Sequence, residues 1–176
     1  HFDEHNIKID IIINSVGFLH DHLIGPEKSL RSFDIENFLK VIKINSCITP
    51  VIAKVFEKYL RRKKLSIFAS ISAKVGSIED NALGGWYSYR ASKAALNSVL
   101  KTFAIEYKRR ASNVKLIAFH PGTVKSQMSE PFRASVPEGK LFEAQYVADC
   151  LAKLMDDIEC DGELSYLDYA GKAIPW

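Results

Sequence analysis

The residues whose types and spacing suit chemistry best are a tyrosine and a lysine in the run Tyr89-Arg90-Ala91-Ser92-Lys93. Side chains four positions apart lie on one face of a helix, so the Tyr89 phenol and the Lys93 ammonium can point into one cleft. A nearby cation lowers the pKa of a phenol from about 10, because it stabilises the phenolate. Tyr89 would then exchange a proton near neutral pH, as a general acid or base does. An ordinary solvated helix start shows the same spacing, so the surrounding elements must decide between the two interpretations.

The elements that must position this pair can be predicted from hydrophobic patterning. Apolar runs predict strands over residues 7–13, 65–71, 114–119 and 162–169. Helical spacing predicts a helical region from an N-cap at Asp34, with Phe33 and Phe38 as a hydrophobic staple and a break near Asn45. Two further helices are predicted over 87–110 and 144–155, and residues 123–140 are expected to form a surface loop or lid.

The order of these elements, β-α-α-β-α-β-α-β, indicates an α/β fold. The strands are continuously apolar, which is typical of a parallel sheet with both faces covered by helices. Such sheets bind ligands beyond the carboxyl ends of their strands. In this chain those ends are the turn at Asn14, the loop at Ser72 and the loop His120-Pro121-Gly122. We therefore expect Tyr89 and Lys93 to act beside these three loops.

Composition excludes several classes of protein. The chain has 176 residues, of which 47% are hydrophobic, enough for the core of one domain. Its 26% of charged residues leave a formal charge of only +3, too balanced to predict a nucleic-acid partner. No apolar run approaches the roughly 20 residues that span a membrane, and no signal peptide is visible. Three widely spaced cysteines, Cys47, Cys150 and Cys160, argue against disulfides and a metal site and indicate a reducing compartment, the cytoplasm.

Five pieces of the sequence follow one another in an informative order. They are Ile12-Ile13-Asn14-Ser15-Val16-Gly17, Ile44-Asn45, Ser70-Ile71-Ser72 leading to Gly76, Tyr89-x-x-x-Lys93, and His120-Pro121-Gly122-Thr123-Val124-Lys125-Ser126. Together they resemble the short-chain dehydrogenase/reductase family. Within that family, residues 75–78, 84–97 and 174–176 look most like the C-factor and Sniffer-like carbonyl reductase branch. The resemblance covers nearly the whole chain.

The resemblance implies a Rossmann-like, doubly wound parallel sheet, of which residues 1–176 would form one partial domain with strands four to seven. It implies an NAD(P)-dependent oxidoreductase, with NADP favoured, that reduces a carbonyl or oxidises a secondary alcohol by hydride transfer. The implied partners are a small-molecule carbonyl or alcohol substrate and a second copy of the chain, with no nucleic acid, membrane or metal. The alternatives are a non-catalytic signalling or interaction protein that keeps the fold, and an inactive truncated product.

By the same resemblance, Tyr89 is the general acid that protonates the carbonyl oxygen, while Lys93 tunes it and binds ribose hydroxyls of the cofactor. Ser72 would donate a hydrogen bond to the same oxygen, and Asn45 would hold a water that links Lys93 to solvent. The implied cofactor-binding residues are Asn14, Gly17, Tyr89, Lys93, Pro121, Gly122, Thr123 and Ser126. The loop to about Lys140 would close over the substrate.

The sequence departs from the family in two places. Ala73 stands where the family has its catalytic serine relative to Gly76, and Ser72 is preferred to Ser77 as its replacement. The family's Thr-Gly-x-x-x-Gly-x-Gly turn, which binds the cofactor pyrophosphate, has no counterpart among the nine glycines. The first predicted strand would then lack a neighbour and leave an apolar edge that favours association. We expect residues upstream of His1 to supply the missing half, and the alternatives are a covering partner chain and a decayed remnant.

Overall fold

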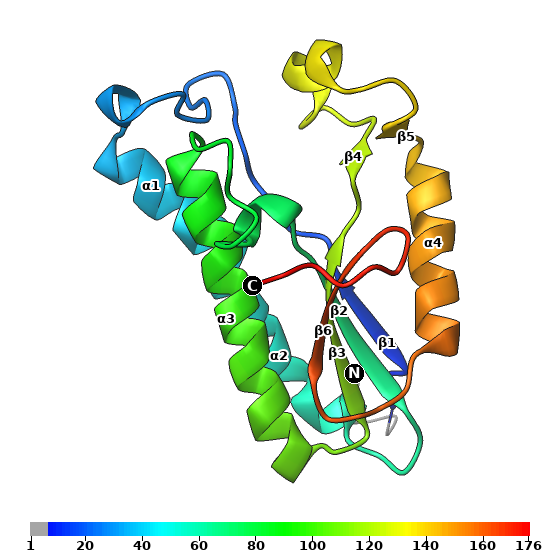
Figure 1. Ribbon diagram of the computed structural model, residues 1–176. Helices are drawn as coiled ribbons and strands as arrows, with labels where there is room; N and C mark the ends of the chain where they lie inside the picture. The colour runs from blue at the N-terminus through cyan, green and yellow to red at the C-terminus, as the bar shows by residue number, and fades with distance from the viewer. Residues whose placement is uncertain (1–6) are drawn as a thin grey trace.

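The β-branched runs form one parallel sheet in the computed structural model, which describes residues 7–176 (Figure 1). Its strand order is β1-β2-β3-β6, and every neighbouring pair is parallel. The strands are β1 (Ile11–Asn14), β2 (Ser66–Ile71), β3 (Val114–His120) and β6 (Leu164–Asp168). The predicted parallel sheet of an α/β fold is confirmed. A separate ladder pairs β4 (Thr123–Val124) with β5 (Leu141–Phe142), at the two ends of the segment expected to be a loop or lid.

Helices cover both faces of the sheet. One face carries α1 (Ile35–Ile42), α2 (Ile48–Leu60) and α3 (Tyr87–Arg110), and the other carries α4 (Ala144–Asp157) (Figure 1). Short 3₁₀ turns span Leu30–Ser32, Lys74–Gly76 and Glu130–Ser135. The helix predicted over 87–110 has the observed bounds, because an uninterrupted run without Pro or Gly leaves little choice. None of the helices among residues 7–176 is long and apolar enough to cross a bilayer.

The first helical region starts and breaks where the sequence predicts. Asp34 caps α1 by accepting a hydrogen bond from a backbone N–H of the first turn at 2.8 Å. The Phe33 and Phe38 rings pack 5.4 Å apart, which confirms the staple. Between α1 and α2 the chain forms a π-helical segment, Lys43–Cys47, with Asn45 at its centre. Pro50, just inside α2, has no N–H to donate, which disturbs the regular ladder at this point.

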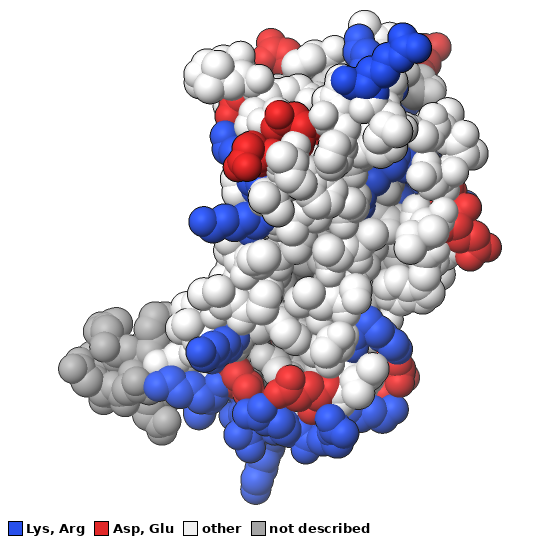
Figure 2. All heavy atoms as spheres, turned by 90° about the vertical axis from the view of Figure 1, so that its left-hand side faces the viewer, with Lys and Arg blue, Asp and Glu red and all other residues white. Residues whose placement is uncertain are grey.

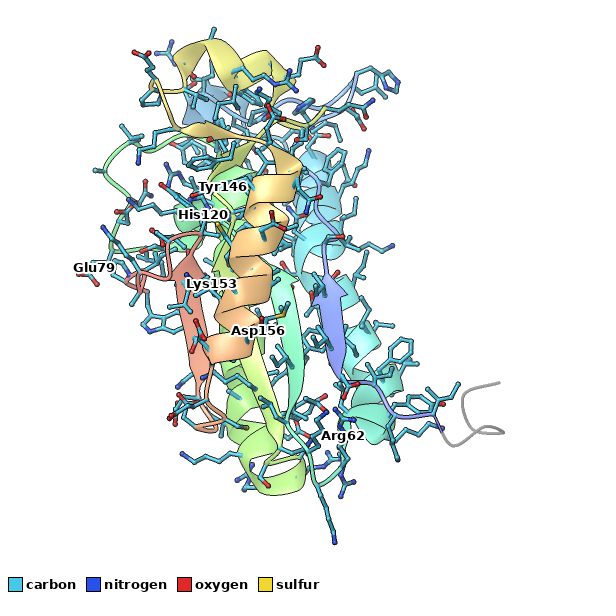
Figure 3. All side chains as sticks on the ribbon, turned by 90° about the vertical axis from the view of Figure 1, so that its right-hand side faces the viewer. Arg62, Glu79, His120, Tyr146, Lys153 and Asp156 are labelled. Atoms are coloured by element: carbon cyan, nitrogen blue, oxygen red, sulfur yellow. The ribbon has the colours of Figure 1, made fainter. Side chains whose placement is uncertain are left out.

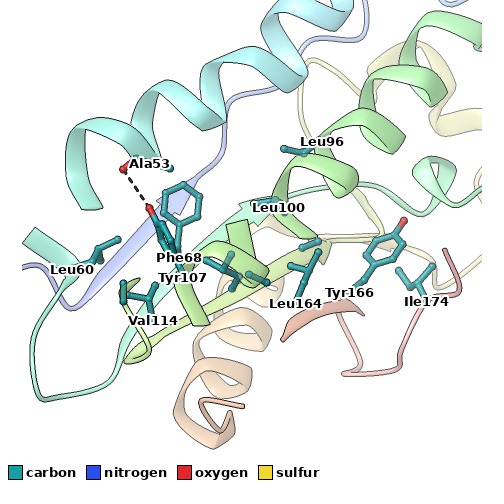
Figure 4. Close-up of a cluster of buried hydrophobic side chains, with 14 residues drawn as sticks. Ala53, Leu60, Phe68, Leu96, Leu100, Tyr107, Val114, Leu164, Tyr166 and Ile174 are labelled. Carbon is teal, nitrogen blue, oxygen red and sulfur yellow. Dashed lines mark hydrogen bonds between the residues drawn. The ribbon is translucent and has the colours of Figure 1, made fainter. Parts of the chain in front are cut away.

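The core has two layers, because successive side chains of a strand point to opposite faces. Phe68 and Leu116 are buried on the side of α2 and α3, where they belong to one cluster with Leu100 of α3 (Figure 4). Ile67 and Phe119 lie on the opposite face in a second cluster with residues of α4. The central strands are therefore buried on both faces, as their continuous apolar sequence predicts.

β1 is the open edge of the sheet. Within the described part of the chain it pairs only with β2. Ile11 and Ile13 are 46% and 48% exposed, and their register partners Ile67 and Ala69 face α4. Figure 3 shows that α4, on which Tyr146 is labelled, runs over the other strands and leaves β1 uncovered. Among residues 7–176, the outer side of β1 is therefore apolar and unpaired, as expected from the sequence.

The strand expected over residues 7–13 is wrong at its start. β1 begins at Ile11, and Ile9 instead donates its backbone N–H to the Tyr59 carbonyl in the last turn of α2, at 3.0 Å. Contact with β2 begins at Asp10, whose carbonyl accepts from the Ile67 N–H at 2.8 Å. The apolar run therefore contains a helix contact followed by a strand, and an apolar run alone cannot separate the two.

Candidate active site

The first two turns of α3 carry the tyrosine and the lysine. The Lys93 Nζ lies 5.7 Å from the centre of the Tyr89 ring, so the two groups share one side of the helix, as their spacing predicts. Lys93 is 2% exposed, and its Nζ donates a hydrogen bond to the Ile71 carbonyl at the end of β2, at 2.8 Å. This bond ties the start of α3 to the carboxyl end of the sheet.

Burial sets the proton affinities of this pair. Desolvation raises the pKa of the Tyr89 phenol to about 12 and lowers the pKa of the Lys93 ammonium to about 8. The direction for Tyr89 is opposite to the one expected from a neighbouring cation. The reason is that the ammonium gives its hydrogen bond to the Ile71 carbonyl, while desolvation of the half-buried Tyr89 disfavours the charged form of its phenol. Tyr89 therefore keeps its proton at neutral pH.

The loop that follows β1 passes close to the Lys93 ammonium. A methyl group placed on Gly17 would lie 3.7 Å from the Lys93 Nζ and 4.0 Å from the Asn45 Oδ1. It would also lie 3.7 Å from the terminal methyl of Met128. Three predicted site residues thus converge on one point, together with Met128, which the sequence analysis did not single out.

Asn45 fastens the loop to α3. Its Nδ2 donates to the Phe18 carbonyl and to the Ser92 Oγ, both at 2.8 Å, and its Oδ1 accepts from the Phe18 N–H at 2.7 Å. Ser92 in turn donates to the Tyr89 carbonyl at 2.8 Å. Both amide hydrogens are used, so any further partner of Asn45 must donate to its Oδ1. Ser92 was overlooked as part of the site although it stands inside the Tyr89 to Lys93 run.

Asn14 holds the turn at the end of β1. It is 4% exposed, and its Nδ2 donates to the Thr49 Oγ1 at 2.8 Å and to the Ser70 Oγ at 3.3 Å. Its Oδ1 accepts from the Val16 N–H at 3.1 Å. The side chain therefore links β1, β2 and α2, which fixes the course of the loop toward Gly17.

The two candidate serines are both buried and both engaged elsewhere. The Ser72 Oγ donates to the Asn97 Oδ1 at 2.7 Å, two turns along α3 from Tyr89. The Ser77 Oγ donates to the Trp176 carbonyl at 3.3 Å and accepts from a backbone N–H in its own turn. Among residues 7–176, neither hydroxyl is hydrogen-bonded to Tyr89. In residues 7–176 the structure therefore directs both candidate hydroxyls to partners other than the phenol.

The segment after β3 is only partly drawn into the site. Pro121 and Thr123 are half-buried, and Gly122 has a φ of 71° in the left-handed region that favours glycine. A methyl group on Gly122 would lie 2.7 Å from the Phe142 ring, so this turn also needs glycine for space. Ser126 is exposed and bonds only within its own loop, and the residue of this loop that reaches Gly17 is Met128.

Aromatic side chains from three loops pack against one another beside Tyr89. The Trp86 ring lies 6.1 Å from the Tyr89 ring and 5.0 Å from the Phe132 ring. His20 contacts Phe132 at 5.7 Å, and its Nε2 lies 2.9 Å from the Met128 carbonyl oxygen. A cavity of about 360 Å³ opens between these loops. His20, from the loop after β1, therefore contacts the loop after β4, and only the fold shows this contact.

His120 ends β3 and faces a different cavity from the one beside Tyr89. It lines a cavity of about 470 Å³ with Lys140 and Lys172, and neither Tyr89 nor Lys93 is part of that lining. Burial lowers the pKa of His120 to about 4. Within residues 7–176, no group of three or more His, Cys, Asp or Glu is placed to hold a metal ion.

Comparisons with known proteins identify the family and the fold of this chain. The chain is 25% identical to the C-signal of Myxococcus xanthus over 168 residues, which cover 96% of this chain and 93% of that protein. It is 26% identical to a benzil reductase ((S)-benzoin forming) of Bacillus cereus, over 94% of this chain but 70% of that protein. The NADPH-bound carbonyl reductase from chicken fatty liver has the same fold, with a TM-score of 0.83 and 21% identity over 99% of this chain and 68% of that one.

The family assignment rests on the sequence. A family model described as Enoyl-(Acyl carrier protein) reductase matches residues 1–159, which is most of the chain. The two relatives cover 96% and 94% of the chain, and the observed sheet is parallel, as the resemblance implied. This chain therefore belongs to the short-chain dehydrogenase/reductase family.

Proposed function

We propose that this chain carries the proton-transfer site of an NAD(P)-dependent oxidoreductase that reduces a carbonyl or oxidises a secondary alcohol. The observation that carries the proposal is a half-buried Tyr89 that keeps its proton beside Lys93, with Lys93 fixed at the carboxyl end of β2. A positioned phenol is a suitable proton donor to a carbonyl oxygen. The names of a related benzil reductase and of a carbonyl reductase with the same fold support this class of reaction.

The residues at the end of β1 fit one end of a nicotinamide cofactor. Gly17 has no side chain, so a ribose hydroxyl can approach the Lys93 ammonium and the Asn45 amide oxygen there. Asn14 holds this loop in place, and the implied contacts at the nicotinamide end are Pro121, Gly122, Thr123 and Ser126. The glycine-rich turn for the pyrophosphate is not among these 176 residues. We therefore assign to these residues only the binding of the nicotinamide end of the cofactor. When bound, the cofactor supplies the hydride, and the NADPH in the chicken enzyme favours NADP.

In this reaction the residues of the chain itself carry out the proton transfer. Tyr89 donates its proton to the carbonyl oxygen during reduction and accepts one from the alcohol in the reverse direction. Lys93 stabilises the phenolate that remains, because its charge lies on the same side of the helix. Asn45 fixes the loop over this pair, with its Oδ1 free for a second donor such as a water. The packed rings of Trp86 and Phe132 exclude water from the reacting groups on the side of Tyr89 that they cover.

The test measures cofactor binding and turnover with this chain and with the same chain extended by any residues that its gene encodes upstream. We expect saturable binding of NADPH, followed by nicotinamide fluorescence, and consumption of NADPH in the presence of a ketone. Failure to bind and to turn over in both forms would contradict the proposal. Titration with NADH alongside decides which of the two cofactors is preferred.

The serine that assists Tyr89 can be identified by two substitutions. Ser72 remains our proposal, although its hydroxyl would have to leave Asn97 to reach a substrate oxygen. We expect Ser72→Ala to lower kcat by about 10-fold or more, as the loss of one oxyanion donor does. Ser77→Ala is the matched control, because Ser77 is equally buried but bonds to the chain end. The reverse result would assign the role to Ser77.

A second candidate function is a signalling or interaction protein that keeps the fold. The observation that favours it is the match to the C-signal over 93% of that protein, whereas the chain spans 70% of the benzil reductase. The same titrations separate the two functions. Absence of NADPH binding in the extended chain, with an intact fold, would favour the second.

We further propose a homodimer formed through the faces of α1, α2 and α3 that point away from the sheet. These faces expose the apolar side chains of Ile35, Leu39, Val51, Val55 and Ile105. Figure 2 shows that Lys, Arg, Asp and Glu gather at the ends of this side of the molecule and leave its middle largely uncharged. Sedimentation at tens of micromolar should give a dimer, and Val51→Glu combined with Ile105→Glu should give a monomer. A wild-type monomer at that concentration would contradict the proposal.

We place the protein in the cytoplasm. Cys47, Cys150 and Cys160 are all unpaired, as expected of a chain that is kept in a reducing compartment.

A further inference from the structure

The N-terminus of α3 lacks a cap from its own segment. Its N-cap residue is Trp86, which has a φ of 52° in the left-handed region and makes no side-chain capping bond. No acidic residue occupies the first turn of α3. α1, in contrast, is capped locally by Asp34. The first backbone N–H groups of α3, two residues before Tyr89, therefore need an acceptor from elsewhere in the chain.

Glu27, from the long loop after β1, provides that acceptor. Its carboxylate is buried, with the residue 6% exposed, and it accepts hydrogen bonds from the Ser88 N–H at 3.2 Å and from the Ser88 Oγ. Its backbone carbonyl accepts from the Trp86 N–H at 2.5 Å. A buried carboxylate requires such partners, and the positive end of the helix dipole stabilises its charge.

The turn before α3 is held from two sides. A methyl group on Gly85 would lie 3.3 Å from the Glu27 carbonyl oxygen, so the two backbones are in close approach. On the other side, the Arg90 Nε donates to the Gly85 carbonyl at 3.0 Å and to the Gly84 carbonyl at 3.3 Å. These contacts with Glu27 and Arg90 keep Trp86 in its left-handed backbone conformation. Such strain persists only where the surrounding structure enforces it.

We propose that Glu27 is a positioning residue, which fixes the first turn of α3 and thereby the place of Tyr89 in the site. This role rests on the proposed function of Tyr89. Glu27 and Ser88 do not touch the reacting groups, so they act through the helix start. Because a displacement of about 1 Å at a reacting group can cost about 100-fold in rate, loss of this hold should reduce kcat more than it weakens substrate binding.

The experiment compares Glu27→Gln with Asp34→Asn in the same catalytically active form of the protein. Both substitutions remove the charge of a carboxylate that caps a helix, but α1 does not carry Tyr89. We expect Glu27→Gln to lower kcat by about 10-fold to 100-fold with KM within about 3-fold, and Asp34→Asn to leave both within about 2-fold. Glu27→Asp, which keeps the charge, should recover part of the rate.

Amide hydrogen exchange gives a readout that does not depend on turnover. Glu27→Gln should speed exchange over residues 86–93, whereas Asp34→Asn should leave exchange over these residues unchanged, because Asn caps a helix about as well as Asp. If the wild type shows no turnover, the proposed function fails while this readout still tests the hold of Glu27. If Glu27→Gln does not fold, Ser88→Ala, which keeps the carboxylate, takes its place with the same two measurements. Wild-type kcat together with unchanged exchange over 86–93 in the folded variant would overturn the proposal.

Discussion

The carboxyl end of β2 and the outer edge of β1 belong to one sheet, yet they differ in how completely this chain surrounds them. At the end of β2, Lys93 is 2% exposed and donates to the Ile71 carbonyl, and Asn45 is bonded on both sides. At the edge, Ile13 is 48% exposed, and no described residue covers it. The contrast shows that residues 7–176 hold the proposed proton-transfer groups in place with their own contacts. The same residues leave the apolar side chains on the outer side of β1 exposed.

The largest effect is expected at the site. Tyr89→Phe should lower kcat by about 100-fold to 10,000-fold, because it removes the only proposed proton donor. Tyr107→Phe is the control, since Tyr107 lies on the same helix with a pKa likewise raised to about 12 by burial and donates to the Ala53 carbonyl. NADPH consumption measures both variants, and circular dichroism checks that both fold. Equal rates for Tyr89→Phe and the wild type would leave the site without its acid.

The second effect is expected in the part of the sheet that is buried on both faces. Phe68 is fully buried between β2 and the helices, so Phe68→Ala should lower the free energy of unfolding by about 3 to 5 kcal/mol. Urea denaturation measures the change. A loss below about 1 kcal/mol would show that the centre of the sheet is no better packed than its edge.

The third prediction concerns pH and Lys93. Its pKa is about 8 in the folded chain against 10.5 for the free side chain, so between these values the unfolded chain binds a proton that the folded chain does not. The free energy of unfolding should therefore rise with pH from about 8 to 10.5, by roughly 3 kcal/mol at most. Above pH 10 the raised pKa of Tyr89 works in the opposite direction, because the folded chain then holds the extra proton.

Urea titrations at several pH values test this dependence. Lys93→Met should flatten the rise between pH 8 and 10.5, whereas Lys101→Met, an exposed lysine on the same helix, should leave it in place. A wild-type profile that is flat over this range would show that Lys93 is better solvated than its burial indicates.

The smallest effect on stability is expected at the edge. Ile13→Ser should change the free energy of unfolding by less than about 1 kcal/mol, because about half of the side chain is already exposed. It should also reduce association of the chain at high concentration, since an apolar edge strand favours pairing with other chains. Light scattering measures this. A loss of stability as large as that of Phe68→Ala would mean that the edge is packed in solution.

The local elements could be predicted because their signals lie within a few residues. Asp34 and the Phe33 and Phe38 staple mark the start of α1, and the spacing of Tyr89 and Lys93 places both groups on one side of α3. The order of apolar strands and helices was sufficient to predict the parallel sheet. These features follow from backbone periodicity and capping, which adjacent residues determine.

Other features of the site depend on residues far apart in sequence, and only the tertiary structure decided them. The pKa of Tyr89 rises because remote segments bury it, the Ser72 hydroxyl turns to Asn97, and Glu27 reaches Ser88 across 61 positions. The bond of Lys93 to the Ile71 carbonyl likewise joins a helix to a strand end. Spacing along the chain determined which groups can meet, but desolvation and hydrogen-bond choice depend on what surrounds each group after folding, which no local pattern encodes.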